Sequence, residues 1–279
     1  MTDVPVIRHN VSQVQVVSAQ GLERPETLAT EEPMEIRLAG PGQAPASVAV
    51  TMRTPGADFE LAVGFLFGAG LLGPAADAVA SVRYCDLPAD AAQRYNIVTV
   101  TSSRPVPAIT ARPFAISSSC GLCGTASLDD LAQRCPAVAP GPPVPAAVVC
   151  ALPDQLRANQ RIFDRTGGLH GAGLFRRDGT LAVAREDVGR HNAVDKVIGH
   201  ALLAGEVPLD GHLLMVSGRV SFEIVEKAAV AGVGVVCAVS APTSLAVDAA
   251  RRFGVTLVAF LRGPHFNIYA HPERIDLSR

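Results

Sequence analysis

The chain of 279 residues contains no tryptophan, and aromatic residues make up only 5% of it. It also lacks an excess of basic residues, because 24 lysines and arginines stand against 26 aspartates and glutamates, a net charge of −2. Binding to nucleic acid through bulk charge is therefore not expected, although a local basic pocket is compatible with this balance. Long apolar runs are missing too: the best one, residues 61–72, is short and interrupted by glycine, so no membrane span is expected.

Cysteine is scarce for a chain of this length. Six cysteines are too few for the disulfide framework of a small secreted protein. The N-terminal sequence MTDVPVIRHNVSQVQVV does not show the basic region, apolar run and small-residue cleavage site of a signal peptide. We therefore expect a cytoplasmic protein, not bound to a membrane, whose thiols are reduced.

The first half of the sequence predicts mainly β-structure. Strands are expected over residues 11–19, 33–39, 46–53, 78–84, 95–102 and 113–117, and helices over 58–72 and 125–134. Asp58 is the expected N-terminal cap of the first helix. The dense Pro/Gly run at 136–147 predicts a linker. We therefore expect a smaller β-rich α+β domain at residues 1–140 and a second domain at 141–279.

The second half alternates predicted helices and apolar strands. Helices are expected over 146–164, 188–204, 221–231 and 244–253, a hairpin over 170–186, and strands over 212–217, 233–239 and 255–261. This succession predicts a mostly parallel sheet covered by helices on both faces, to which the hairpin adds an antiparallel pair. The expected fold class is α/β, a three-layer sandwich with a mixed sheet that is similar to the cytidine deaminase-like architecture.

Two cysteines have a spacing that suggests chemistry. Cys120 and Cys123 lie in SSSCGLCG, between a predicted strand and a predicted helix. A structural zinc ion usually needs four ligands, and the sequence has neither a second CxxC nor an HxxxH pair, so no metal is expected. The other cysteines stand singly and are interpreted as small buried hydrophobic residues. They are Cys85, Cys135, Cys150 and Cys237.

The cysteine pair leaves two chemical interpretations open. In a dithiol oxidoreductase it would cycle between dithiol and disulfide, but no tryptophan flanks the motif, and Gly121 and Gly124 loosen the loop. In a sulfur carrier the same glycines would let a cysteine persulfide swing between donor and acceptor. Free N–H groups at the start of the next helix would favour the thiolate, and the second cysteine could relay the sulfur. The loop residues alone favour neither interpretation over the other.

Polar residues gather where the predicted strands of the second half end. The loops at 217–221 and 240–244 present hydroxyls and N–H groups at helix starts, which suits phosphate, although ordinary capping explains either loop alone. The last predicted strand ends in the stretch 260–267, which reaches the same edge, where ligands of open α/β sheets bind. His170, in a glycine-rich turn, is interpreted as structural.

The stretch REDVGRHNAVDK, residues 185–196, is also dense in polar groups. Asp187 as a helix cap and an i,i+4 pair of His191 with Asp195 explain part of it. They leave Arg185, Arg190, Asn192 and Lys196 unexplained, so a functional site is favoured. A zinc deaminase is not expected, since that class needs H-x-E followed by P-C-x-x-C, and here Cys120 is preceded by Ser119 and its CxxC lies before the α/β half.

Seven longer motifs follow one another along the chain: TPGADFELAVGFLFGAG, SSSCGLCG, TGGLHGAGL, REDVGRHNAVDKVIG, SGRVSFEIVEKAA, SAPTSLAVDAA and RGPHFNIYAHPERI. Together they resemble the FdhD family (FdhD/NarQ type), the formate dehydrogenase accessory sulfurtransferases. The resemblance covers nearly the whole chain from about residue 33.

The resemblance implies a sulfurtransferase. A cysteine desulfurase would load sulfur onto Cys120 as a persulfide, with Cys123 assisting or relaying it. The sulfur would pass to the molybdenum or tungsten bis(molybdopterin guanine dinucleotide) cofactor (Mo-bis-MGD) of formate dehydrogenase, bound here as a substrate that GDP partly mimics. The resemblance further implies a homodimer that interacts with the formate dehydrogenase catalytic subunit. A dithiol oxidoreductase and a non-catalytic chaperone of the cofactor or apo-enzyme are the alternatives.

The cofactor is expected at the polar edge of the sheet, above all at residues 260–265. The predicted binding residues are Arg190, His191, Asn192, Ser217, Gly218, Arg219, Ser240, Thr243, Ser244, Phe260, Leu261, Arg262, Gly263, Pro264 and His265.

Overall fold

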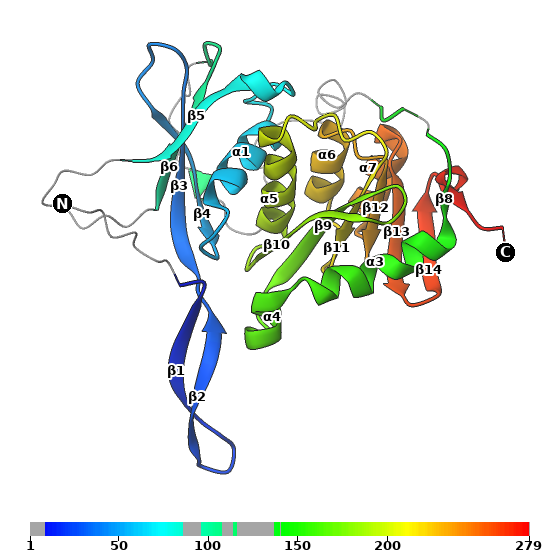
Figure 1. Ribbon diagram of the computed structural model, residues 1–279, viewed down its shortest axis with the longest axis horizontal. Coiled ribbons are helices and arrows are strands. Elements are labelled where there is room, and N and C mark those ends of the chain that lie inside the picture. Colours follow the sequence, from blue (N-terminus) through cyan, green and yellow to red (C-terminus); the bar gives the residue numbers. More distant parts are fainter. Residues whose placement is uncertain (1–8, 86–95, 108–113, 116–136, 140, 279) are drawn as a thin grey trace, which may run out of the picture.

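The computed structural model describes residues 9–85, 96–107, 114–115, 137–139 and 141–278. Two larger β-sheets stand next to each other, and helices pack between and around them (Figure 1). No described helix is long and apolar enough to cross a membrane.

The first half forms a sheet with the strand order β5-β6-β3-β4-β7. Its strands are β3 (Glu32–Ala39), β4 (Ala46–Arg53), β5 (Val79–Tyr84), β6 (Ile97–Ser102) and β7 (Phe114–Ala115), and β5 follows the 3-10 turn η1 (Ala76–Ala78). Side chains alternate across a strand, so Met34, Ile36 and Leu38 of β3 share one face, and all three are buried. They belong to the same apolar cluster as helix α1 (Asp58–Gly68), which covers this face.

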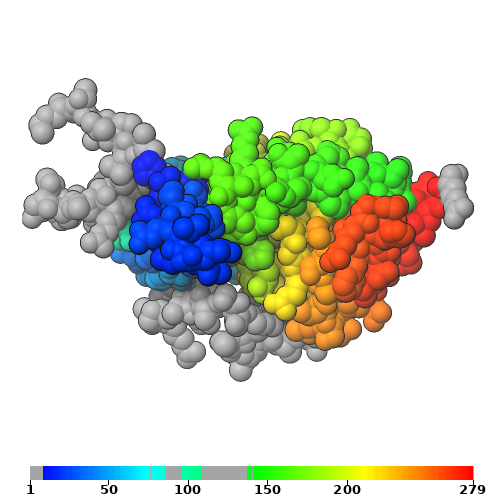
Figure 2. Space-filling model, turned by 90° about the horizontal axis from the view of Figure 1, so that it is seen from below, coloured from blue at the N-terminus to red at the C-terminus, as the bar shows by residue number. Residues whose placement is uncertain are grey.

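A two-stranded hairpin, β1 (Val11–Val17) and β2 (Glu23–Ala29), extends away from the body of the molecule (Figure 1). Seen from below, it lies against the segment that contains helix α4 (Arg161–Thr166), and α4 contacts β2 (Figure 2). An isolated hairpin is only marginally stable in water, so this contact supports it.

The second half forms a six-stranded sheet with the order β10-β9-β11-β12-β13-β14. Its strands are β9 (His170–Arg176), β10 (Leu181–Asp187), β11 (His212–Val216), β12 (Val235–Ala238), β13 (Thr256–Arg262) and β14 (His265–Ala270). Strands β11, β12 and β13 are parallel, whereas β10, β9 and β14 join through antiparallel pairs. The expected mixed sheet is thus confirmed.

Helices cover both faces of this sheet and complete a three-layer sandwich. Helices α5 (Arg190–Leu203), α6 (Phe222–Val230) and α7 (Ser244–Phe253) lie on one face, and α3 (Ala146–Ala158) lies on the other. Strand β11 shows why: Leu214 and Val216 pack with the first group of helices, whereas Leu213 and Met215 pack with α3. The continuous apolar strands are typical of a sheet buried on both faces.

Besides short strands, the structure differs from the sequence prediction in three larger elements. The strand at 255–261 is not the last one, because the chain turns back at Gly263 into β14. The helix expected over 146–164 is divided into α3 and α4 around Asn159. Strand β2 was not predicted, since its sequence ERPETLA is polar and carries a proline. β14 and β2 are both edge or isolated strands, whose exposed faces lack the apolar signal that marks a buried strand.

The predicted linker is attached to the second half of the molecule. The Val138 N–H donates to the carbonyl of Phe253 at 2.9 Å. The short strand β8 (Val144–Pro145) pairs with β15 (Ile275–Asp276), which follows the 3-10 turn η2 (Pro272–Arg274). The boundary near residue 140 stays a prediction. The cysteine loop and the helix expected over 125–134 lie outside the described residues.

Helices α1 and α5 cross with their backbones in direct contact. A Cβ atom added to Gly64 of α1 would lie 1.9 Å from the carbonyl oxygen of Asp195, and one added to Gly199 of α5 would lie 1.9 Å from that of Glu60. No side chain fits at either position. The crossing joins the two halves into one apolar cluster, which includes residues from both sheets.

Buried ion pairs and polar contacts flank this crossing. Lys196 lies 2.7 Å from Asp187, and both side chains are almost fully buried. The Lys196 ammonium also donates to the carbonyl of Thr54 at 3.0 Å, and the Thr54 N–H donates to Asp187 at 3.1 Å. Arg185 forms a two-pronged pair with Glu60 of α1, at 2.5 and 2.6 Å. Much of the polar stretch at 185–196 therefore holds the halves together.

We predict that Gly199→Ala lowers the free energy of unfolding by about 2 kcal/mol or more, because the added methyl group must push α1 and α5 apart. Denaturant titration measures this change. Gly73→Ala is the matched control, since its Cβ would meet only the Ala78 methyl group at 3.9 Å. Equal stability of the two variants would contradict the proposed backbone contact.

Candidate functional site

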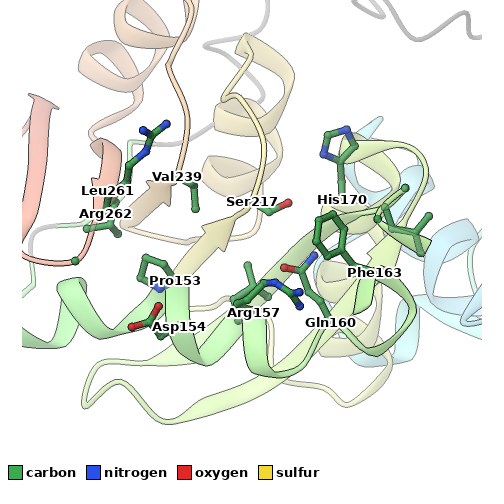
Figure 3. A pocket seen from close by; sticks show the side chains of 15 residues that line it. Pro153, Asp154, Arg157, Gln160, Phe163, His170, Ser217, Val239, Leu261 and Arg262 are labelled. Carbon is green, nitrogen blue, oxygen red and sulfur yellow. The ribbon is translucent and has the colours of Figure 1, made fainter. Parts of the chain in front are cut away.

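A pocket of about 730 Å³ opens at the carboxyl ends of the parallel strands. Ser217 after β11, Val239 after β12 and Leu261 near the end of β13 form one wall. Helices α3 and α4 form the facing wall with Arg157, Phe163 and neighbouring residues (Figure 3). Its volume lies within the range of small-molecule and cofactor pockets.

The charged groups around the pocket are mainly positive. Arg157 and Arg262 line it, with Asp154 as the acidic counterpart. The Arg157 guanidinium lies 4.7 Å from the centre of the Phe163 ring and pairs with Asp164 at 2.5 Å. Guanidinium groups recognise phosphate and carboxylate groups, so the pocket suits an anionic ligand.

The structure brings only some of the predicted cofactor-binding residues to this pocket. Ser217, Leu261, Arg262 and Gly263 line it. The sequence interpretation missed the wall formed by α3 and α4. A usable signal was the glycine-rich turn at 166–170, which follows these helices and carries His170 into the pocket.

Next to the pocket, Gly171 of β9 and Ser217 after β11 are joined by two hydrogen bonds. The Gly171 N–H donates to Ser217 Oγ at 2.9 Å, and the Ser217 N–H donates to the carbonyl of Gly171 at 2.9 Å. A Cβ atom on Gly218 would lie 3.2 Å from His170 Nδ1. His170 is therefore held in place, and burial together with the nearby charge of Arg190 lowers its pKa.

Arg190, whose charge acts on His170, also has a side-chain donor without an acceptor. Its Nε atom is buried and has no hydrogen-bond partner among the described residues. A buried N–H without an acceptor is costly, and a bound ligand is one way to satisfy it. This feature agrees with the prediction that Arg190 contacts a ligand, which stays a prediction.

Phe260 shows backbone strain at the same edge. Its φ angle is 53°, a left-handed conformation that is rare outside glycine, and 42% of its surface is exposed. The pairing of β13 with β14 shifts register between Ala259 and Arg262. Such strain clusters at functional sites, and here it turns a bulky ring toward solvent just before the pocket residues Leu261 and Arg262.

Other predicted residues have structural contacts instead. Thr243 caps α7 by accepting the Ala246 N–H at 3.2 Å. Asn192 donates to the carbonyl of Met52 at 2.8 Å and to Asp187 at 2.9 Å. Ser240, Ser244, Arg219, Pro264, His265 and Gly218 lie at the same strand ends but do not line the described pocket. Their cofactor-binding role stays a prediction.

Three helix-capping and pairing expectations were wrong. Asp187 does not cap α5, because Gly189 is the residue before that helix and its first turn has no side-chain capping bond. Asp58 begins α1 rather than capping it; the residue before it is Ala57, with a φ angle of 55°, and Asp58 pairs with the buried Arg53 at 2.9 Å. His191 and Asp195 do not pair with each other, because Asp195 contacts Lys227 at 2.7 Å. The carboxylates of Asp58 and Asp195 accept from cations on other segments, which local sequence spacing does not reveal.

His191 instead links the starts of α5 and α6. Its Nε2 atom lies 2.8 Å from Ser221 Oγ, and its Nδ1 atom lies 3.1 Å from Glu223. Ser221 precedes α6 but makes no capping bond with its side chain. Burial, opposed by Glu223, lowers the pKa of His191 to about 4. The ring is therefore neutral near pH 7, and the carboxylate orients it so that Nε2 can accept the hydroxyl proton.

This arrangement can move a proton. A hydroxyl, a neutral imidazole and a carboxylate in this order are the groups that activate a nucleophile in many enzymes. The sequence prediction placed His191 in the site but gave Ser221 and Glu223 no such role. The motifs did contain all three residues, yet only the folded chain brings them together.

The structure describes three of the six cysteines. Cys237 is fully buried, and burial raises its pKa to about 12, as expected for an inert core residue. Cys85 and Cys150 are half-buried rather than buried. Cys120, Cys123 and Cys135 lie outside the described residues. Within the described ranges no cluster of three or more His, Cys, Asp or Glu side chains could hold a metal ion.

Fold and site together define an α/β protein with a three-layer sandwich and an anion-suited pocket at its strand ends. A family model described as FdhD/NarQ family matches residues 29–276. The chain belongs to the FdhD/NarQ family.

Curated relatives and a solved structure agree with this assignment. "Sulfur carrier protein FdhD" of Mycolicibacterium paratuberculosis is 52% identical over 93% of this chain and 96% of its own length. The protein of the same name from Streptomyces avermitilis is also 52% identical, over 91% of this chain and 90% of its own. A putative formate dehydrogenase accessory protein from Desulfotalea psychrophila has the same fold, with a TM-score of 0.71 and 26% identity over 95% of this chain and 98% of that one.

We predict that acid weakens the fold partly through His191. Its folded pKa of about 4 lies below the ordinary histidine pKa of 6.5, so below about pH 6.5 protons favour the unfolded chain. Stability should fall by about 3 kcal/mol as pH drops toward 4. Denaturant titrations across this pH range should show a steeper decline for the native chain than for His191→Gln. Parallel declines would contradict the buried neutral imidazole.

Proposed function

We propose that this protein is a sulfur carrier in the maturation of formate dehydrogenase. The observation that carries the proposal is the combination of the Cys120-Gly121-Leu122-Cys123 motif with family membership, since curated relatives bear the name sulfur carrier protein. The solved relative is described as a formate dehydrogenase accessory protein.

The proposed sulfur transfer begins with a thiolate. The Cys120 thiolate attacks the outer sulfur of a cysteine desulfurase persulfide, forms a new S–S bond and releases the desulfurase thiolate. Cys120 then carries one extra sulfur. If Cys123 attacks the inner sulfur of Cys120, a disulfide forms and sulfide leaves, so atoms and electrons balance. The sulfide is destined for the metal of the substrate cofactor.

The proposed acceptor, Mo-bis-MGD, carries phosphates and guanine bases, for which the strand-end pocket is suited. Arg262 and Ser217 offer donors for phosphate oxygens, and Phe163 offers an aromatic face. The free Nε of Arg190 supplies another donor next to His170. The Ser221–His191–Glu223 arrangement could hold or move a proton near this edge. Cysteine desulfurase, formate dehydrogenase and a second copy of the chain are the proposed partners.

We predict that incubation with a cysteine desulfurase and cysteine adds one sulfur, about 32 Da, in a form that a thiol reductant removes. Intact mass measurement should show this gain in the native chain and in the control Cys150→Ala, but not in Cys120→Ala. A gain that survives Cys120→Ala would move the carrier role to another cysteine. Absence of any gain with a competent donor would reject sulfur transfer and leave the chaperone alternative, while a Cys120–Cys123 disulfide alone would favour the oxidoreductase.

We predict that GDP binds at the strand-end pocket and that Arg262→Gln weakens it about tenfold, because one charge-assisted hydrogen bond is lost. Added salt should weaken binding in the native chain more than in the variant. Calorimetric titration measures both effects. Arg251→Gln removes an exposed arginine at the far end of α7 and is the matched control. Unchanged affinity in Arg262→Gln would remove this segment from the site.

A further inference from the structure

A second pocket, of about 350 Å³, lies at the opposite edge of the six-stranded sheet. His212 and Val235, which begin β11 and β12, line it together with Arg274 of η2. The segments at 138–139 and 141–142 close one side. The strand-end pocket lies beyond the carboxyl ends of the same strands, so the two pockets are separated by the length of the sheet.

Two buried nitrogen atoms on the lining residues of this second pocket lack partners. Arg274 Nη1 and His212 Nδ1 are buried and make no hydrogen bond within the described part of the chain. Arg274 is only 7% exposed. Its Nη2 atom donates to the carbonyls of Val138 and Ala139 at 3.1 and 3.2 Å, which fixes the guanidinium plane and leaves Nη1 unused.

An unsatisfied buried guanidinium is costly, because arginine stays charged at every physiological pH. Three unpartnered buried side-chain nitrogens occur among the described residues, and two of them line this one pocket. Two unpartnered nitrogens on the lining of one pocket are what a binding site for a hydrogen-bond acceptor would show. Water is the simplest occupant, but each buried water needs several polar partners and cannot balance a charge.

The charges on the lining residues favour an anion. Arg274 and Arg177 are positive, and Asp210 is the acidic residue on the lining. Arg177 donates to the carbonyl of Pro142, which holds it at the rim. Asp210 is exposed, so solvent screens its charge more than that of the buried Arg274.

We propose that this second pocket is a binding site for the oxyanion group, phosphate or carboxylate, of a small metabolite. Arg274 Nη1 and the N–H of His212 Nδ1 donate to the oxyanion, and Arg177 adds charge at the rim. The planar guanidinium, fixed by its two carbonyl contacts, is preorganised for this recognition. The site is separate from the sulfur-transfer site and does not depend on the proposed function.

The test is a calorimetric titration of the full chain with inorganic phosphate, repeated with acetate to separate the two oxyanions. His212→Phe keeps the ring shape but removes the nitrogen, so it should weaken binding about tenfold. Asp210→Asn removes the repelling charge and should strengthen binding about threefold. A gain of affinity cannot arise from misfolding, which keeps the proposal testable if one variant proves unstable.

Arg262→Gln distinguishes the two pockets. Phosphate affinity that falls in Arg262→Gln but not in His212→Phe would place the anion at the strand-end pocket and overturn the proposal. No heat of binding with either anion in the native chain would show that the second pocket does not bind these oxyanions, which also overturns the proposal. Affinity that changes in both His212→Phe and Asp210→Asn, in opposite directions, supports it whatever the outcome of the sulfur-loading experiment.

Discussion

The backbone contact between α1 and α5 at Gly64 and Gly199 determines how the two halves of the molecule meet. Because no side chain separates the helices there, groups on either side are brought close and shielded from water. This shielding explains why ion pairs such as Lys196–Asp187 are found buried on the flanks of the crossing. A buried charge without its partner is strongly destabilising. These pairs therefore stabilise the one relative position of the two halves in which every buried charge has its partner.

The contact between α1 and α5 also positions the side chain of His191. Helix α5 begins at Arg190, and the anchoring of Lys196 and Asn192 to the segment before α1 fixes its first turn. His191 is thereby held against Ser221 and Glu223, in surroundings that keep the imidazole neutral. A proton-handling group needs fixed geometry more than flexibility, and here the geometry comes from helix packing rather than from a loop.

The two edges of the six-stranded sheet offer different binding surfaces. At the carboxyl ends of its parallel strands lie the larger pocket, the strained Phe260 and the free donor of Arg190. At the opposite edge Arg274 ties the predicted linker to the sheet and retains an unused donor of its own. Residues 138–139, which Arg274 holds there, line the site proposed at this edge.

The sequence by itself determined the family, the fold class and most buried strands. Buried strands such as β11 and β12 are continuous apolar runs, which local periodicity detects. Only the tertiary structure revealed β14, whose edge position leaves it half exposed, and the wall of α3 and α4 that faces Ser217. The contact of His191 with Ser221 spans 30 residues of sequence. Local patterns report which face of an element is apolar, whereas such contacts depend on how elements pack, and this is decided by the crossing of α1 and α5.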